Sequence, residues 1–265
     1  MGKIKISELS LYRWRYHIGY GLVAIGLVSV LIYAGLYTPG GINDQEIQSV
    51  IKSNGINFSN FGSLAITNLP YHILQWLSIT IFGVTIFSIK LPSIILALFS
   101  AIGLILLLKI WFKPRIGVLA SLIAITTGQF LFIAQDGTPN ILYLFWSVYL
   151  ILIATLISTQ KRFRMLYKVS FCVIAGLSLY TPLSIYVLIA MGSAILLHPH
   201  LRFLIRQLSK PKIIASLIFA FLLTIPLIVT IYKTPGLGLE LLGIPAKMPN
   251  FGSSLSSIGA IFGSY

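Results

Sequence analysis

Runs of apolar residues long enough to cross a membrane recur along the chain, and they restrict the fold more than any other feature. A crossing helix needs roughly 20 apolar residues to span about 30 Å of hydrocarbon. Hydrophobic residues make up 57% of the sequence, charged residues make up 9%, and the mean hydropathy is +0.95. In a soluble domain about a quarter of the residues are charged. The sequence therefore predicts an all-α integral membrane protein.

Seven passes through the membrane are expected. Full spans are predicted at residues 18–37, 86–108, 116–135, 140–158 and 213–232. The stretch 168–197 is predicted to make two short passes that are broken at Tyr180-Thr181-Pro182. Proline lacks a backbone donor and pushes the preceding residue out of helical geometry, so it supplies the break. The apolar run 18–37 is span-length, which favours a retained anchor over a cleaved signal peptide.

The net charge of +14 follows the predicted topology. Cytoplasmic loops of membrane proteins carry an excess of lysine and arginine. With a cytoplasmic N-terminus, all but four of the 19 basic residues fall on that side, the exceptions being Lys52, Lys90, Lys233 and Lys247. Four of the five acidic residues fall outside, namely Asp44, Glu46, Asp136 and Glu240. We therefore expect a multi-pass cell-membrane protein with a cytoplasmic N-terminus, membrane lipids as its surroundings and no nucleic acid as a partner.

Residues 1–232 are predicted to form one transmembrane module, whose first extracytoplasmic loop covers residues 38–86. Within this loop, Asn43 and Glu46 have the spacing of a capping box for a short helix that ends before Gly55. A second short helix is expected after Asn68-Leu69-Pro70, and such helices lie on the membrane surface. Residues 233–265 are rich in Gly, Pro and Ser and are expected to be an extracytoplasmic tail or the start of a truncated C-terminal region.

Asp44 is the first candidate for chemistry, because acidic residues are scarce near the predicted outer surface. Its carboxylate can act as a general base on an acceptor hydroxyl or help to hold a divalent cation such as Mg, Mn or Zn. In the alternative interpretation, Asp44 only complements the helix dipole. Glu46 is the second candidate metal ligand, although the capping box explains it by itself and the two carboxylates lie about 200° apart around a helix.

Six residues are candidates for substrate binding: Glu46, His72, Lys90, Asp136, Tyr180 and Thr181. His72 can contact a phosphate or ligate a metal, and Lys90 is one of the few outer cations that can meet a leaving phosphate. Asp136 precedes a glycine, a pair that also signals an ordinary turn. Tyr180 and Thr181 lie at the helix break, where non-helical backbone must be buried in protein or line a cavity.

Stretches of the sequence resemble a known family. Residues 37–46 end in an acidic motif before a surface helix, residues 68–74 contain Leu-Pro-Tyr, residues 81–84 contain Phe-Gly, and residues 87–93 read Phe-Ser-Ile-Lys-Leu-Pro-Ser. Together they resemble the polyprenol-phosphate-sugar-dependent membrane glycosyltransferases of the GT-C class, of the glycosyltransferase family 39 type. That family includes bacterial relatives of protein O-mannosyltransferases and lipid A aminoarabinose transferases.

The resemblance implies a seven-pass GT-C transmembrane core module with short surface helices in its first extracytoplasmic loop. It also implies inverting transfer from a polyprenyl-phosphate sugar donor to a protein, glycan or lipid acceptor, with Asp44 at the position of the catalytic aspartate. Gln45 stands where an acidic partner is usual, and Asn140 stands where family members often have aspartate. Such enzymes usually continue beyond seven spans, so the chain is expected to be the core module alone or a fragment.

Two other functions remain open at this stage. The first is a non-catalytic subunit that binds a lipid-linked saccharide for a partner. Gln45 and Asn140 favour it, because they replace acidic residues that are usual in the family. A transporter is less favoured, because the few polar groups within the predicted spans offer no ion pathway.

Overall fold

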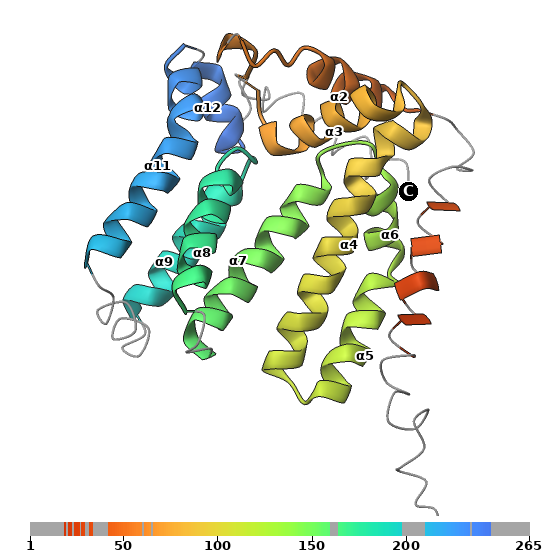
Figure 1. The fold of residues 1–265 in the computed structure, drawn as a ribbon, viewed down its shortest axis with the longest axis vertical. Helices are drawn as coiled ribbons and strands as arrows, with labels where there is room; N and C mark the ends of the chain where they lie inside the picture. The colour runs from red at the N-terminus through yellow and green to blue at the C-terminus, as the bar shows by residue number, and fades with distance from the viewer. Residues whose placement is uncertain are drawn as a thin grey trace, which may run out of the picture. The chain divides into compact units, whose positions relative to one another are not determined.

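Every element in the described part of the chain is a helix, as the apolar runs predict. The computed structural model describes residues 42–59, 61–64, 66–159, 164–197, 210–233 and 235–244, together with scattered positions between 19 and 33. The first predicted span as a whole, the basic N-terminal tail, the segments 160–163 and 198–209 that are predicted to be cytoplasmic, and the tail after residue 244 lie outside these residues. Figure 1 shows the helices in chain order.

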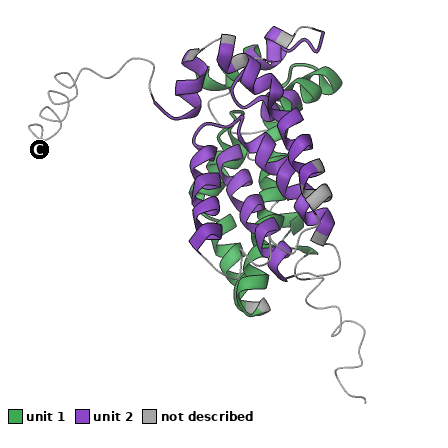
Figure 2. Ribbon diagram, turned by 90° about the vertical axis from the view of Figure 1, so that its left-hand side faces the viewer, with its two compact units in different colours: residues 1–51, 74–141 green, residues 52–73, 142–265 purple. Residues whose placement is uncertain are grey.

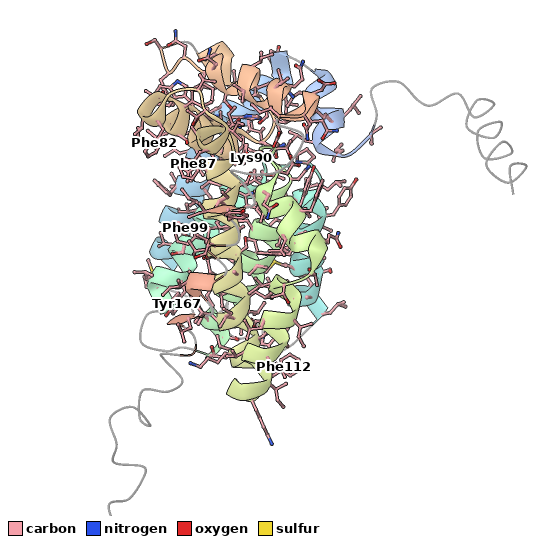
Figure 3. All side chains as sticks on the ribbon, turned by 90° about the vertical axis from the view of Figure 1, so that its right-hand side faces the viewer. Phe82, Phe87, Lys90, Phe99, Phe112 and Tyr167 are labelled. Atoms are coloured by element: carbon pink, nitrogen blue, oxygen red, sulfur yellow. The ribbon has the colours of Figure 1, made fainter. Side chains whose placement is uncertain are left out.

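Two described helices are long and apolar enough to cross a membrane, α4 (Ile86–Trp111) and α7 (Ile141–Thr159). They match the spans predicted at 86–108 and 140–158. The side of α4 that faces away from the protein is apolar, with Ile95, Phe99 and Ile102 between 38% and 52% exposed (Figure 3 labels Phe99). Side chains of this kind are compatible with lipid rather than water.

The span predicted at 116–135 is divided in the structure. It forms α5 (Pro114–Ile125) and α6 (Gly128–Gln135), which are bent by 59° and together can count as one broken span. The hydroxyls of Thr126 and Thr127 donate to carbonyls of the preceding turn, and Thr127 also caps α6. Threonine side chains that bond nearby backbone groups compete with the helical ladder, so they end α5 and start a new helix.

Three further helices contain shorter apolar stretches: α8 (Arg164–Ser178), α9 (Ser184–Leu197) and α11 (Lys210–Lys233). The predicted break in 168–197 is confirmed, since residues 179–183 separate α8 from α9. By length and composition the described residues hold two crossing helices, or three with the bent pair. The count of seven passes therefore stays a prediction.

The chain divides into two compact units, coloured separately in Figure 2. The first comprises residues 1–51 and 74–141 and contains α4, α5, α6, most of α2 (Asp44–Asn54) and most of α3 (Leu69–Phe82). Helix α4 packs against both α5 and α6. Its turn into α5 is tight, because a Cβ at Gly117 would lie 2.5 Å from the carbonyl oxygen of Leu108.

The second unit comprises residues 52–73 and 142–265. It contains α8, α9 and α11, nearly all of α7, the 3₁₀ turn η2 (Phe61–Leu64) and the short helix α12 (Pro235–Leu241). Helix α11 packs against α8, α12 and η2. Cys172 on α8 faces α11, where its Sγ donates to the Ser216 hydroxyl at 3.4 Å.

Both short helices predicted in the first loop are present, and their position on the membrane surface stays a prediction. The capping box of α2 is confirmed, because the Glu46 amide donates to the Asn43 side chain at 2.8 Å and the Asn43 amide donates to the Glu46 carboxylate at 3.0 Å. Helix α2 ends at Asn54, and α3 begins directly after Asn68. The start of α4 is fixed by a second capping box, formed by Thr85 and Ser88.

Candidate functional site

The buried face of α2 is polar and its apolar face points outward. Glu46, Ser49 and Ser53 are at most 4% exposed, whereas Ile47 and Ile51 are 44% and 57% exposed. Burying polar groups is unfavourable unless each one is hydrogen-bonded. The partners of this stripe therefore define the candidate site.

Glu46 is the centre of a buried cluster in the first unit. Its Oε1 accepts a hydrogen bond from the Gly137 amide at 2.7 Å and lies 3.5 Å from the ammonium of Lys90. The two side chains of this ion pair are 3% and 6% exposed. Lys90 is labelled in Figure 3 and lies in the second turn of α4. The pair therefore ties the first turn of α2 to α4 and to the segment that follows α6.

Gln75 on α3 bridges the same elements. Its Oε1 accepts from the Ser49 hydroxyl at 2.8 Å, and its Nε2 lies 3.2 Å from the Ile89 carbonyl oxygen and 3.1 Å from that of Gly137. The Gln75 side chain is fully buried. In Figure 1, α2 and α3 run across the N-terminal end of α4. No sequence signal indicated this bridging position of Gln75.

Gly137 has no room for a side chain. A Cβ at this residue would lie 3.0 Å from both Glu46 Oε1 and Ile89 Cγ2. The amide of Gly137 donates to Glu46 and its carbonyl accepts from Gln75, so its backbone must approach both side chains closely. The glycine of the Asp-Gly pair is thus required by packing within the cluster, in addition to any turn preference.

Asp136 lies beside this cluster, with its carboxylate held by its own segment. Its Oδ2 accepts from the hydroxyl of Thr138 at 2.5 Å and from the amide of Asn140 at 3.2 Å, while Ser93 on α4 donates to its backbone carbonyl. Its Oδ1 is buried and has no donor within the described part of the chain. Asn140, at the position where the resembling family often has aspartate, thus supports a carboxylate four residues earlier.

Asp44 differs from Glu46 in its surroundings. It is the first residue of α2, and its side chain is exposed. The structure therefore separates the two acids that the sequence considered together: Asp44 is open to solvent or ligand, while Glu46 is enclosed.

A divalent cation does not fit the Asp44 and Glu46 pair as arranged here. Both Glu46 oxygens already accept backbone N–H groups, and Lys90 supplies the neutralising charge. Among the described residues, no group of three or more His, Cys, Asp or Glu side chains could hold a metal ion. Hard cations such as Mg²⁺ need several oxygen ligands at once.

The other predicted residues lie in the second unit. His72 is 2% exposed, and its Nδ1 lies 2.8 Å from the Ser53 hydroxyl, which joins α3 to the end of α2. Thr181 accepts from the indole of Trp146 at 2.8 Å, and the hydroxyl of Tyr180 donates to the Leu223 carbonyl at 2.8 Å. The predicted helix break is thus held by buried side-chain hydrogen bonds to α7 and α11.

Comparison with known proteins gives one match. The family described as dolichyl-phosphate-mannose-protein mannosyltransferase matches residues 70–230, which is more than half of the chain. Neither the comparison with curated proteins nor that with solved structures finds a match. The matched residues include His72, Gln75, Lys90 and Asp136, but they begin after Asp44 and Glu46.

Proposed function

Because the chain belongs to the dolichyl-phosphate-mannose-protein mannosyltransferase family of membrane glycosyltransferases, we propose that it moves a sugar from a polyprenyl-phosphate donor to an acceptor hydroxyl on the extracytoplasmic face. The acceptor oxygen attacks the anomeric carbon, and the bond from that carbon to the phosphate oxygen breaks. The polyprenyl phosphate leaves with the bonding electron pair. The acceptor is a protein, glycan or lipid, and a single displacement inverts the anomeric configuration.

In this proposal Asp44 is the general base that removes the proton from the acceptor hydroxyl. A general base must come within hydrogen-bond reach of the proton that it removes. The carboxylate of Asp44 at the start of α2 is exposed, so an acceptor hydroxyl can approach it. The carboxylate of Glu46 is less suited to this role, because it is enclosed and paired with Lys90. The observation that carries this assignment is the contrast between the two acids on one helical turn.

Glu46 and Lys90 serve as positioning residues in this proposal. The ion pair fixes the first turn of α2, and therefore Asp44, relative to α4 and the segment around Gly137. Gln75 holds the same elements from α3. A base held by rigid, hydrogen-bonded neighbours keeps its orientation through the reaction, which is how positioning contributes to rate.

The developing charge on the leaving phosphate needs a cation or hydrogen-bond donors. Lys90 and His72 are buried and already bonded in this structure. Lys52, in the last turn of α2, is exposed and is the outer lysine that we propose for this role.

The test is sugar transfer in membranes that contain the full chain. A panel of radiolabelled polyprenyl-phosphate sugars is supplied to membranes with wild type, with Asp44→Asn or with no expressed protein. Gln48→Ala, an exposed position on α2, is the matched control. We expect label transfer by wild type and the control only. Absence of transfer by folded wild type from every donor would contradict the proposal.

A further inference from the structure

Three segments of the second unit that are far apart in sequence meet around Asn68. The Asn68 amide donates to the carbonyl of Tyr180 at 2.7 Å, which joins the start of α3 to the helix break. The Leu183 amide donates to the carbonyl of Leu241 at 2.9 Å, which joins the break to the end of α12. The Thr67 hydroxyl donates to Glu240 at 3.3 Å, which joins the residue before Asn68 directly to α12. These contacts bring a turn, a helix break and a short helix together.

Asn68 has an unusual conformation for the residue that precedes a helix. Asparagine at this position normally accepts a backbone N–H of the first turn with its side-chain oxygen. Here its φ is 57°, and its backbone carbonyl accepts from the amides of Tyr71 and His72. Its side-chain oxygen caps no backbone N–H of a described residue, although Asn68 is only 8% exposed.

The Asn68 Oδ1 atom is buried and has no hydrogen-bond donor within the described part of the chain. Buried polar atoms are almost always hydrogen-bonded, since leaving one unpaired is unfavourable. Asparagine in a left-handed conformation is tolerated, but glycine would satisfy the backbone equally well. The side chain therefore requires an explanation beyond the turn, and a bound molecule that supplies a donor provides one.

The neighbouring groups indicate which kind of molecule. Glu240 offers an exposed carboxylate beside the Thr67 hydroxyl. Carboxylate and amide oxygens accept from O–H groups, and the Thr67 hydroxyl can both donate and accept. A carboxylate repels phosphate. The set therefore suits a neutral ligand with several hydroxyl groups.

We propose that Asn68 and Glu240, with Thr67 beside them, bind the hydroxyl groups of a saccharide. The proposal rests on the glycosyltransferase function proposed above, because that reaction brings sugars to the chain. Thr67, Asn68 and Glu240 lie outside residues 70–230, so the family match does not assign them a role. The saccharide belongs either to the lipid-linked donor or to the acceptor.

The experiment measures binding to the purified full chain in lipid nanodiscs. The probes are a polyprenyl-phosphate hexose, polyprenyl phosphate without sugar, and a soluble methyl hexoside. Asn68→Gly removes the side chain while glycine keeps the positive φ, and Glu240→Gln removes only the charge. Asn54→Gly, at an exposed residue in the last turn of α2, is the control. Thermal melts report whether each variant is folded.

We expect both variants to bind one sugar-bearing probe about tenfold more weakly, as for the loss of a hydrogen bond to a buried or charged group. Weaker binding of the polyprenyl-phosphate hexose assigns the site to the donor. Weaker binding of the methyl hexoside alone assigns it to the acceptor. Binding of polyprenyl phosphate should be unchanged. Unchanged binding of both sugar probes by the folded variants would overturn the proposal, as would an equal loss for the bare lipid phosphate.

The outcome is separable from that of the proposed function. Wild type that binds the sugar probes through Asn68 and Glu240 without transferring label would refute the transferase reaction and leave the saccharide site intact. If Asn68→Gly melts well below the control, Asn68→Asp replaces it, since aspartate also tolerates the left-handed conformation and exchanges the amide for a charge.

Discussion

Lys90→Met should destabilise the chain strongly, because it leaves the Glu46 carboxylate buried without its counter-charge. Removing one member of a buried ion pair typically costs about 3–5 kcal/mol. Glu46 retains the amides of Gly137 and Asn43 as donors, at 2.7 and 3.0 Å. We therefore expect the free energy of unfolding to fall by about 3 kcal/mol, the lower end of this range. For a chain of this size that is a fall in Tm of about 6–12 °C.

The assay is a thermal melt in detergent, followed by tryptophan fluorescence, with a double-mutant cycle through Glu46→Gln. The double variant Glu46→Gln/Lys90→Met should be more stable than Lys90→Met alone, because no unpaired charge remains buried. Lys52→Met, which removes an exposed lysine, should change the free energy of unfolding by less than about 0.5 kcal/mol.

Additive losses in that cycle would refute the reasoning. If Glu46→Gln and Lys90→Met together cost the sum of the two single changes, the two side chains do not stabilise each other. The Glu46–Lys90 ion pair would then not hold the first turn of α2, and its proposed positioning role would be refuted as well.

Three further changes test other contacts by the same melts. Gly137→Ala should cost about 1–3 kcal/mol, because its Cβ would crowd Glu46 at 3.0 Å, whereas Gly128→Ala, which meets nothing within 4 Å, should be neutral or stabilising. Asn43→Ala removes the side-chain cap of α2 and should cost about 1 kcal/mol. Trp146→Phe deletes a buried indole donor and should cost at least about 1 kcal/mol. Stability equal to wild type in Gly137→Ala, Asn43→Ala or Trp146→Phe would contradict the contact concerned.

The local chemistry of the sequence predicted the elements well. The capping box of Asn43 and Glu46, the helix after Asn68 and the break at Tyr180-Thr181-Pro182 are all in the structure. Each depends on residues within a few positions of one another, so spacing alone is informative. Apolar runs likewise predicted α4 and α7.

Long-range partners could not be predicted from the same sequence. Glu46 pairs with Lys90 and accepts from Gly137, which lies 91 residues away. Local spacing contains no information about such contacts, and the capping box seemed to account for Glu46 fully. The bend after Thr126 was also missed, because the polar residues 126–129 were included in one predicted span although the hydroxyl side chains there break the helix.

The central claim, a glycosyltransferase whose base is Asp44, is tested most directly by kcat for sugar transfer in purified wild type and Asp44→Asn. The account predicts that kcat falls by about 10²–10⁴-fold, the usual contribution of a general base, while the melting temperature stays that of wild type. An unchanged kcat in the folded variant would contradict it and remove Asp44 from the reaction.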